Sequence, residues 1–214
     1  MKSIMMSSGM AGLNLAIIFH EVDRELHYVD KVINNADLSK DNNQLILDLR
    51  IKISSLTSLL ESFSPLLKQT VNNKKDAEYL INKAVNINKS RFEHHNIIYS
   101  SPILNGEDEN FAINGPSSLI LSSINNIIDN SVYWLGVENT QTERKALYIS
   151  TDLESFSGNA IIIADNGLGF SVESDYAIRP FATSKPGGMG MGLYLANLVM
   201  ETIGGKLLIF PKEE

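Results

Sequence analysis

The feature that most constrains this chain is a regular recurrence of apolar residues in its N-terminal third. Between residues 15 and 33, and again between residues 46 and 67, apolar residues follow one another at alternating intervals of three and four. The two runs are Leu15, Phe19, Val22, Leu26, Val29 and Ile33, then Ile46, Leu49, Ile53, Leu56, Leu60, Phe63 and Leu67. A repeat of about 3.5 residues is typical of helices that supercoil around each other. The pattern predicts two antiparallel helices joined by the polar stretch 34–43.

Two such helices alone would leave much of their apolar stripes in water. Two copies of the chain can bury them in a four-helix bundle, so we expect a homodimer through the helical hairpin. The alternative is that the hairpin packs on the rest of its own chain. Pro65 removes one backbone donor and should kink or end the second helix.

From residue 72 onward, helix-like and strand-like patterns are mixed. We expect helices over 77–87, 117–135 and 192–202, and strands over 96–101, 146–151, 160–164 and 206–210. Pro116 suits the first turn of the middle helix, whereas Gly204 and Gly205 end the last one. The predicted fold class is α+β. A helical hairpin (1–71) forms a four-helix bundle by dimerisation and precedes an α/β-sandwich domain (72–214).

Composition excludes several classes of protein. The 214 residues include no cysteine, which rules out disulfides and thiolate metal sites. The net charge of −7 argues against nucleic acid as a partner. No run is long and apolar enough for a membrane helix, and polar residues interrupt any N-terminal signal peptide. We therefore expect a cytoplasmic protein with no membrane segment in this chain.

His20 lies one position beyond the apolar stripe of the first helix, and Glu21 follows it. A neutral imidazole can act as a nucleophile while a neighbouring carboxylate orients the ring and takes up its proton. An ordinary solvated histidine is the alternative.

Asn126 and Asn130 lie four residues apart, hence on one face of the predicted 117–135 helix. The amide oxygen of Asn130 is a ligand type that magnesium accepts, although chance explains the spacing equally well.

A strongly apolar strand ends at Asp165 and runs into a turn that contains Gly167 and Gly169. A carboxylate at this place can accept a hydrogen bond from the amine of adenine, and the glycines let the backbone approach a flat base. The alternative is an ordinary strand followed by a turn that binds no ligand.

Glycines also precede the last predicted helix, at Gly188, Gly190 and Gly192, and Lys185 comes just before them. Glycine-rich backbone before a helix N-terminus can surround a phosphate, and Lys185 adds a positive charge. The spacing matches neither the P-loop nor the dinucleotide fingerprint. A flexible linker does not explain why a helical pattern resumes at once.

Taken in order, His-Glu, Asn-x-x-x-Asn, Asp-x-Gly-x-Gly, Phe-x-x-Ser-Lys and Gly-x-Gly-x-Gly resemble the catalytic core of a two-component sensor histidine kinase. That family shares an ATPase superfamily with DNA gyrase B and the heat-shock chaperone ATPases. The resemblance covers nearly the whole chain. It implies that residues 1–71 are a dimerisation and histidine phosphoacceptor domain and that residues 72–214 are an ATP-binding catalytic domain.

The resemblance assigns roles to individual residues. His20, in FHEVDREL, matches the phosphoacceptor, and Glu21 matches the acidic neighbour that accepts the proton. Asn126 and Asn130, in NNIIDNSVYW, match the N box, with Asn130 as the Mg²⁺ ligand and Asn126 near the phosphates. Trp134 stands where the family often has an aromatic residue against adenine.

The remaining boxes follow. Asp165, Gly167 and Gly169, in DNGLGF, match the G1 box, with Asp165 on the adenine amine. Phe181, in RPFATSK, matches the F box, and Lys185 resembles a lysine that reaches the γ-phosphate. The G2 box is matched by Gly188, Gly190 and Gly192, in GGMGMGL.

Four features of the sequence depart from the family pattern. Glu25 replaces the usual proline five residues after the histidine, and Tyr133 replaces a common basic residue of the N box. The segment between Lys185 and Gly188, which corresponds to the ATP lid, is very short. The chain ends after one predicted strand, where the family usually adds another, so either the native protein continues or the domain has an open sheet edge.

The resemblance implies an ATP-dependent protein-histidine kinase that uses ATP and Mg²⁺. It would phosphorylate itself on His20 and pass the phosphoryl group to an aspartate in the receiver domain of a separate response regulator. One alternative is an ATPase of the same superfamily, although such relatives have a glutamate where this chain has Asn126. Another is a non-catalytic dimeric scaffold or phosphotransfer module. Serine/threonine kinases of the anti-sigma type lack the long hairpin with His-Glu.

Overall fold

The structure, a computed structural model, describes residues 72–137, 144–170, 172–186 and 188–210, and selected positions between 22 and 57. Those positions are 22, 24, 26–29, 31, 33, 45–51, 53, 54, 56 and 57. The chain divides into two compact units, Met1–Ser64 and Pro65–Glu214. The predicted boundary between residues 71 and 72 borders a stretch outside the described residues and stays a prediction.

The described residues of the first unit are helical, in one group between 22 and 33 and another between 45 and 57. Helices in both places agree with the predicted hairpin. Leu26, Ile46 and Ile53 of the apolar stripes are 52%, 51% and 54% exposed in the single chain. The stripes therefore keep apolar surface that a partner could cover. His20 and Glu21 lie outside the described residues.

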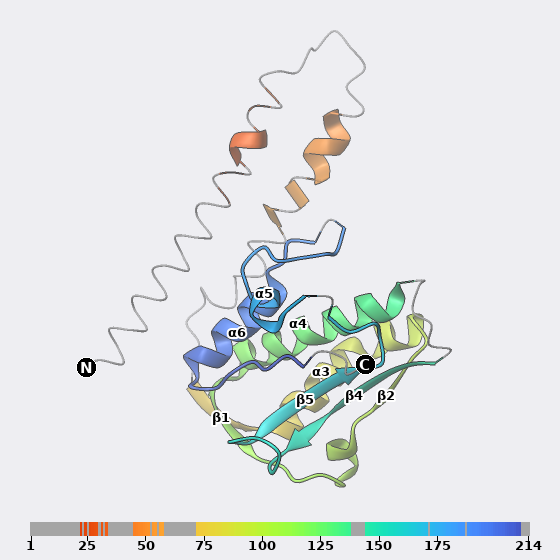
Figure 1. The fold of residues 1–214 in the computed structure, drawn as a ribbon, viewed down its shortest axis with the longest axis vertical. Coiled ribbons are helices and arrows are strands. Elements are labelled where there is room, and N and C mark those ends of the chain that lie inside the picture. Colours follow the sequence, from red (N-terminus) through yellow and green to blue (C-terminus); the bar gives the residue numbers. More distant parts are fainter. Residues whose placement is uncertain are drawn as a thin grey trace, which may run out of the picture. The chain divides into compact units, whose positions relative to one another are not determined.

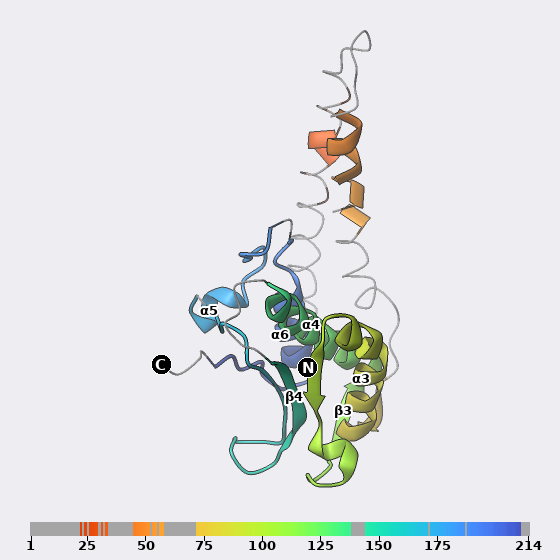
Figure 2. The same cartoon turned by 90° about the vertical axis from the view of Figure 1, so that its right-hand side faces the viewer.

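The second unit is built from helices packed on a sheet (Figures 1 and 2). A three-stranded sheet has the order β2-β4-β5, with β2 parallel to β4 and β4 antiparallel to β5. A separate antiparallel pair joins β1 to β3. The strands are β1 (Asn72–Asp76), β2 (Ile97–Ser100), β3 (Ala112–Pro116), β4 (Lys145–Asp152) and β5 (Ala160–Asp165).

Three long helices cover one face of the three-stranded sheet, with α4 between α3 and α6 (Figure 1). The helical elements of this unit are α3 (Ala77–His94), a 3-10 helix (Pro102–Asn105), α4 (Ser117–Gly136), the short α5 (Ser174–Ala177) and α6 (Gly192–Thr202). No helix among the described residues is long and apolar enough to cross a membrane.

The hydrophobic core lies between these helices and the sheet. Its fully buried members include Phe92 of α3, Ile128 and Leu135 of α4, and Leu147 and Ile149 of β4. Side chains alternate across a strand, and Ala146 and Tyr148, which flank Leu147, are exposed on the other face, whereas Ser150, which follows Ile149, is fully buried. The core therefore fixes α4 against the sheet and leaves the opposite side of α4 for polar residues.

The α+β fold class is confirmed, and α4, α6, β2, β4 and β5 lie within two residues of their predicted bounds. The helix predicted over 77–87 continues to His94, because Asn88 and Phe92 extend its buried side. The strand predicted over 206–210 is wrong: these residues form no ladder. Instead, the Ser174 hydroxyl donates to the Ile209 carbonyl at 2.9 Å, and the Phe210 ring meets the Phe156 ring at a tilt of 44°.

Candidate nucleotide-binding site

One side of α4 carries the two asparagines that the sequence singled out. Asn126 and Asn130 are partly buried, whereas Ile128 between them points into the core and is fully buried. Asn126 faces α6: a Cβ atom built on Gly192 would lie 3.7 Å from the Cβ of Asn126. The start of α6 therefore approaches Asn126 to within ordinary van der Waals distance.

The N-terminus of α6 thus lies beside Asn126. This helix begins at Gly192, and no side chain caps its first backbone N–H groups. The first N–H groups of a helix have no partner within the helix and carry a partial positive charge. The arrangement places backbone donors suited to an anion next to an asparagine amide.

Gly190 lies directly against the backbone that follows Phe181. A Cβ atom built on Gly190 would lie 2.5 Å from the carbonyl carbon of Phe181 and 2.7 Å from the nitrogen of Ala182. Gly190 also has φ +67°, a left-handed conformation that glycine adopts most easily. Two predicted motifs, around Phe181 and around Gly190, are therefore in contact in the fold.

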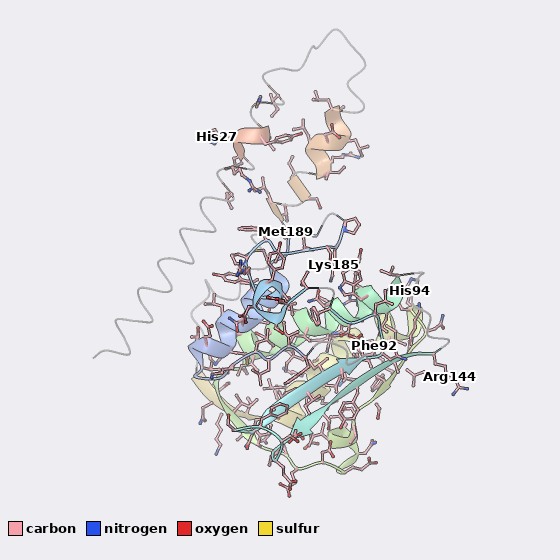
Figure 3. The ribbon with its side chains drawn as sticks, viewed as in Figure 1. His27, Phe92, His94, Arg144, Lys185 and Met189 are labelled. Carbon is pink, nitrogen blue, oxygen red and sulfur yellow. The ribbon has the colours of Figure 1, made fainter. Side chains whose placement is uncertain are left out.

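Lys185, which lies between Phe181 and Gly190 in the sequence, connects the segment 181–190 to α4 (Figure 3). Its ammonium donates a hydrogen bond to Oδ1 of Asn130 and lies 4.6 Å from the centre of the Tyr133 ring. Burial lowers the pKa of Lys185 below its usual value; the charge of Asp129 acts in the opposite direction and that of Arg91 in the same direction. A partly desolvated cation is thus held over α4.

A tight turn supports Lys185. Its backbone N–H donates to the Thr183 hydroxyl at 3.1 Å, and its carbonyl accepts from the N–H of Gly188 at 2.9 Å. A Cβ atom on Gly188 would lie 2.9 Å from both the Thr183 hydroxyl oxygen and the Cβ of Lys185. Gly188 is therefore needed for the turn that positions the ammonium.

The turn after β5 forms a second part of the site. Asp165 is exposed at the strand end, and its Oδ1 accepts from the N–H of Gly167 at 3.0 Å. Asn166 fixes the turn to β4, donating to the Arg144 carbonyl at 2.7 Å and accepting from the Ala146 N–H at 2.8 Å. The carboxylate is thus displayed on a rigid loop.

This turn packs against the C-terminal part of α4. A Cβ atom on the buried Gly167 would lie 3.8 Å from a methyl carbon of Leu135. Leu135 follows Trp134, which is partly buried and meets Tyr133 edge to face at 5.1 Å between ring centres. The Asp165 turn and the asparagine face are therefore both anchored on α4.

The structure brings most of the predicted site residues together around α4 and the start of α6. Contacts link Asn126 to Gly192, Asn130 to Lys185, Lys185 to Gly188, and Phe181 to Gly190. Asp165 and Gly167 join this group through Leu135, and Gly169, with φ +79°, continues their turn. No contact joins Trp134 to Asp165 among those seen in the described residues.

The sequence prediction gave no role to Tyr133 beyond noting a departure from the family pattern. Its ring carries the Lys185 ammonium, and its position three residues after Asn130 on the same helix face was the available signal. The prediction also missed the ion pair between Arg91 and Asp129, which joins α3 to α4 next to the site.

The residues present fit a magnesium ion that arrives with a nucleotide, but they do not form a metal site by themselves. No group of three or more histidine or carboxylate side chains among the described residues could hold a metal. Magnesium commonly binds one or two protein oxygens together with substrate phosphates and water. The Asn130 oxygen suits that mode, since Asn130 lies one helical turn from Asn126, beside which α6 begins.

A curated protein has a sequence similar to that of this chain. No protein-family model matches the chain. A probable C4-dicarboxylate sensor kinase of Halalkalibacterium halodurans is 26% identical over 194 residues. The match covers 88% of this chain and 32% of the relative, so the chain spans about a third of that protein's length.

Solved structures show the same fold. The histidine kinase ThkA, in complex with the response regulator protein TrrA, has a TM-score of 0.54 at 14% identity, covering 91% of this chain and 55% of that one. Full-length ShkA in complex with AMPPNP has a TM-score of 0.52 at 16% identity, covering 89% and 41%. The chain therefore shares the fold of histidine kinases, and its resemblance to their catalytic core is confirmed.

Proposed function

We propose that this chain is an ATP-dependent protein-histidine kinase core that phosphorylates itself on His20. The observation that supports this most is the meeting of four sequence segments around α4. Two asparagines, a lysine, a glycine-rich segment and an uncapped helix N-terminus are joined by a chain of pairwise contacts. Such a group offers donors for phosphates and an oxygen for their metal ion.

In this proposal each part of the site holds one part of ATP. The carboxylate of Asp165 accepts from the adenine amine, and Gly167 and Gly169 allow the base to approach. The glycine-rich segment and the N-terminus of α6 receive the phosphates beside Asn126. Asn130 supplies an oxygen to Mg²⁺, which when bound would neutralise charge on the phosphates. That ShkA was solved with AMPPNP supports adenine nucleotide as the ligand.

The transfer step follows from the chemistry of His20 and Glu21. A neutral imidazole nitrogen of His20 attacks the γ-phosphorus, the bond from that phosphorus to the bridging oxygen breaks, and ADP leaves. The proton of His20 passes to Glu21. The protein's contribution is mainly positioning and charge stabilisation.

The phosphoryl group then passes to an aspartate of a response regulator. The nitrogen–phosphorus bond breaks as a carboxylate oxygen attacks, and His20 is restored. That ThkA was solved in complex with a response regulator supports this class of partner. The exposed stripe residues Leu26, Ile46 and Ile53 support a homodimer through the hairpin.

The test is incubation with γ-labelled ATP and magnesium. Wild-type protein should become labelled with an acid-labile phosphoryl group, and His20→Ala should not. His27→Ala is the matched control, because His27 is an exposed histidine of the same predicted helix and should leave labelling unchanged. Absence of label in the wild type, or full labelling of His20→Ala, would contradict the proposal. Release of free phosphate without labelling would favour an ATPase.

A further inference from the structure

The Asn130 amide oxygen, which the proposed function gives to a magnesium ion, already accepts a hydrogen bond from the Lys185 ammonium. One oxygen therefore has two possible cationic partners. Magnesium binds oxygen at about 2.1 Å, and an ammonium within hydrogen-bonding distance of the same oxygen would bring two positive charges close together. Their repulsion in a partly buried site is strong unless an anion lies between them.

The ammonium is held in this place by more than one contact. Tyr133 presents its ring to Lys185 at 4.6 Å from the ring centre, an attraction between a cation and an aromatic face. The turn from Thr183 to Gly188 fixes the backbone of Lys185. Asp129 is paired with Arg91, and the hydrogen bond of the Lys185 ammonium goes to Asn130.

From this geometry, and on the premise of the proposed function, we infer that Lys185 and magnesium exchange at Asn130. The ammonium leaves Asn130 only when a metal-bound nucleoside triphosphate offers its terminal phosphate in return. A nucleoside diphosphate has no terminal γ-phosphate to offer, so Lys185 keeps the oxygen and opposes binding of the metal. Lys185 thereby selects triphosphate over diphosphate, with Tyr133 as the residue that positions it.

Exchange can be separated from a simple contact between lysine and phosphate. A simple contact predicts that removal of the ammonium weakens triphosphate binding and leaves diphosphate binding unchanged. Exchange predicts in addition that the variant binds ADP more tightly, and only when magnesium is present, because Asn130 has been freed for the metal.

The experiment is calorimetric titration of the full chain with ADP and with a non-hydrolysable ATP analogue, each with magnesium and with a chelator. Lys185→Met keeps the length of the side chain and removes its charge. We expect the affinity for ADP with magnesium to rise about fivefold, the order of a cation–aromatic contact, and to stay unchanged with chelator. The affinity for the ATP analogue should fall about tenfold, or about 1.4 kcal/mol. Lys89→Met, at an exposed lysine of α3, is the matched control and should change none of these values.

Tyr133 gives a second, independent variant. Tyr133→Leu removes the aromatic face and should raise ADP affinity with magnesium about threefold, whereas Tyr133→Phe keeps the ring and should behave as wild type. Trp134 is the single tryptophan of the chain and touches Tyr133, so its fluorescence reports the exchange without any measurement of catalysis. Wild-type emission should differ between the ATP analogue with magnesium and the same analogue with chelator, a difference that adenine beside Trp134 does not by itself produce. Magnesium alone should not change it.

The outcomes separate the two proposals. If the wild type binds adenine nucleotides but Lys185→Met does not tighten ADP binding with magnesium, exchange is refuted and the proposed function stands. If Lys185→Met tightens ADP binding equally with chelator, exchange is also refuted, because the gain does not involve the metal. If the wild type binds no adenine nucleotide, both proposals fail.

Discussion

Replacement of Gly190 by alanine should separate two segments of the candidate site. Gly190 has φ +67°, and its Cα lies against the backbone of Phe181 and Ala182. An added Cβ would meet the Phe181 carbonyl carbon at 2.5 Å, a distance that non-bonded carbon atoms in folded proteins do not adopt. The neighbours are backbone atoms, so relief requires a shift of one whole segment.

The expected loss of stability in Gly190→Ala has two contributions. A left-handed conformation costs a non-glycine residue about 1–2 kcal/mol. Overpacking that forces the backbone to shift adds about 1–3 kcal/mol. Gly190→Ala should therefore lower the free energy of unfolding by about 2–5 kcal/mol. Because the shift moves the glycine-rich segment, affinity for a magnesium-bound ATP analogue should fall on the order of tenfold or more.

Gly204→Ala measures the conformational contribution alone. Gly204 has φ +81°, and no atom lies within 4 Å of the position its Cβ would take. It should lose only about 1–2 kcal/mol and keep wild-type nucleotide affinity. Urea unfolding and calorimetric titration of both variants give the comparison. Equal destabilisation of the two variants, with unchanged nucleotide affinity in Gly190→Ala, would refute this reasoning.

Three further predictions concern the α/β domain. Asn88 is 1% exposed and bonds to the Ala84 carbonyl and to Asn125, so Asn88→Ala should lower the unfolding free energy measured in urea by about 1–3 kcal/mol; no loss would contradict this. Ile128→Ala, at a fully buried position of α4, should cost about 2–5 kcal/mol in the same assay, and a loss below about 1 kcal/mol would show that the core is looser than described. Burial lowers the pKa of His95, with the charges of His94, Lys145 and Arg91 acting in the same direction. The unfolded chain therefore takes up this proton at a higher pH than the folded chain, so stability should fall as the pH decreases through about 6.5, and His95→Gln should flatten that slope in urea titrations at several pH values.

The elements that the sequence predicts well are those whose apolar pattern is local. Helix α4 combines a proline at its start with buried residues at helical spacing. In β4, the buried Leu147 and Ile149 alternate with exposed neighbours on their N-terminal sides, and β5 carries three consecutive isoleucines. Strand β1 was missed because its residues, NNKKD, contain nothing apolar. It forms by pairing with β3, about forty residues later, and no local pattern encodes that pairing.

The candidate site likewise contains some features with a local sequence signal and others without one. The glycines at 188, 190 and 192 signal close backbone approach in the sequence itself, and the structure places backbone or side-chain atoms against all three. The contact of Lys185 with Asn130 and Tyr133 was not predictable, because it depends on the path of an irregular segment over α4. Local spacing fixes the residues on one helix face but not which distant side chain will reach them.

The central claim is that the segments gathered around α4 form an adenine nucleotide site. Titration of the wild type with non-hydrolysable ATP and GTP analogues, in magnesium, tests it directly, with Asp165→Asn as the variant. We expect the ATP analogue to bind at least about tenfold more tightly than the GTP analogue, because the Asp165 carboxylate accepts from the adenine amine. Asp165→Asn should lose most of that preference. Equal binding of the two analogues by the wild type, or binding of neither, would contradict the account.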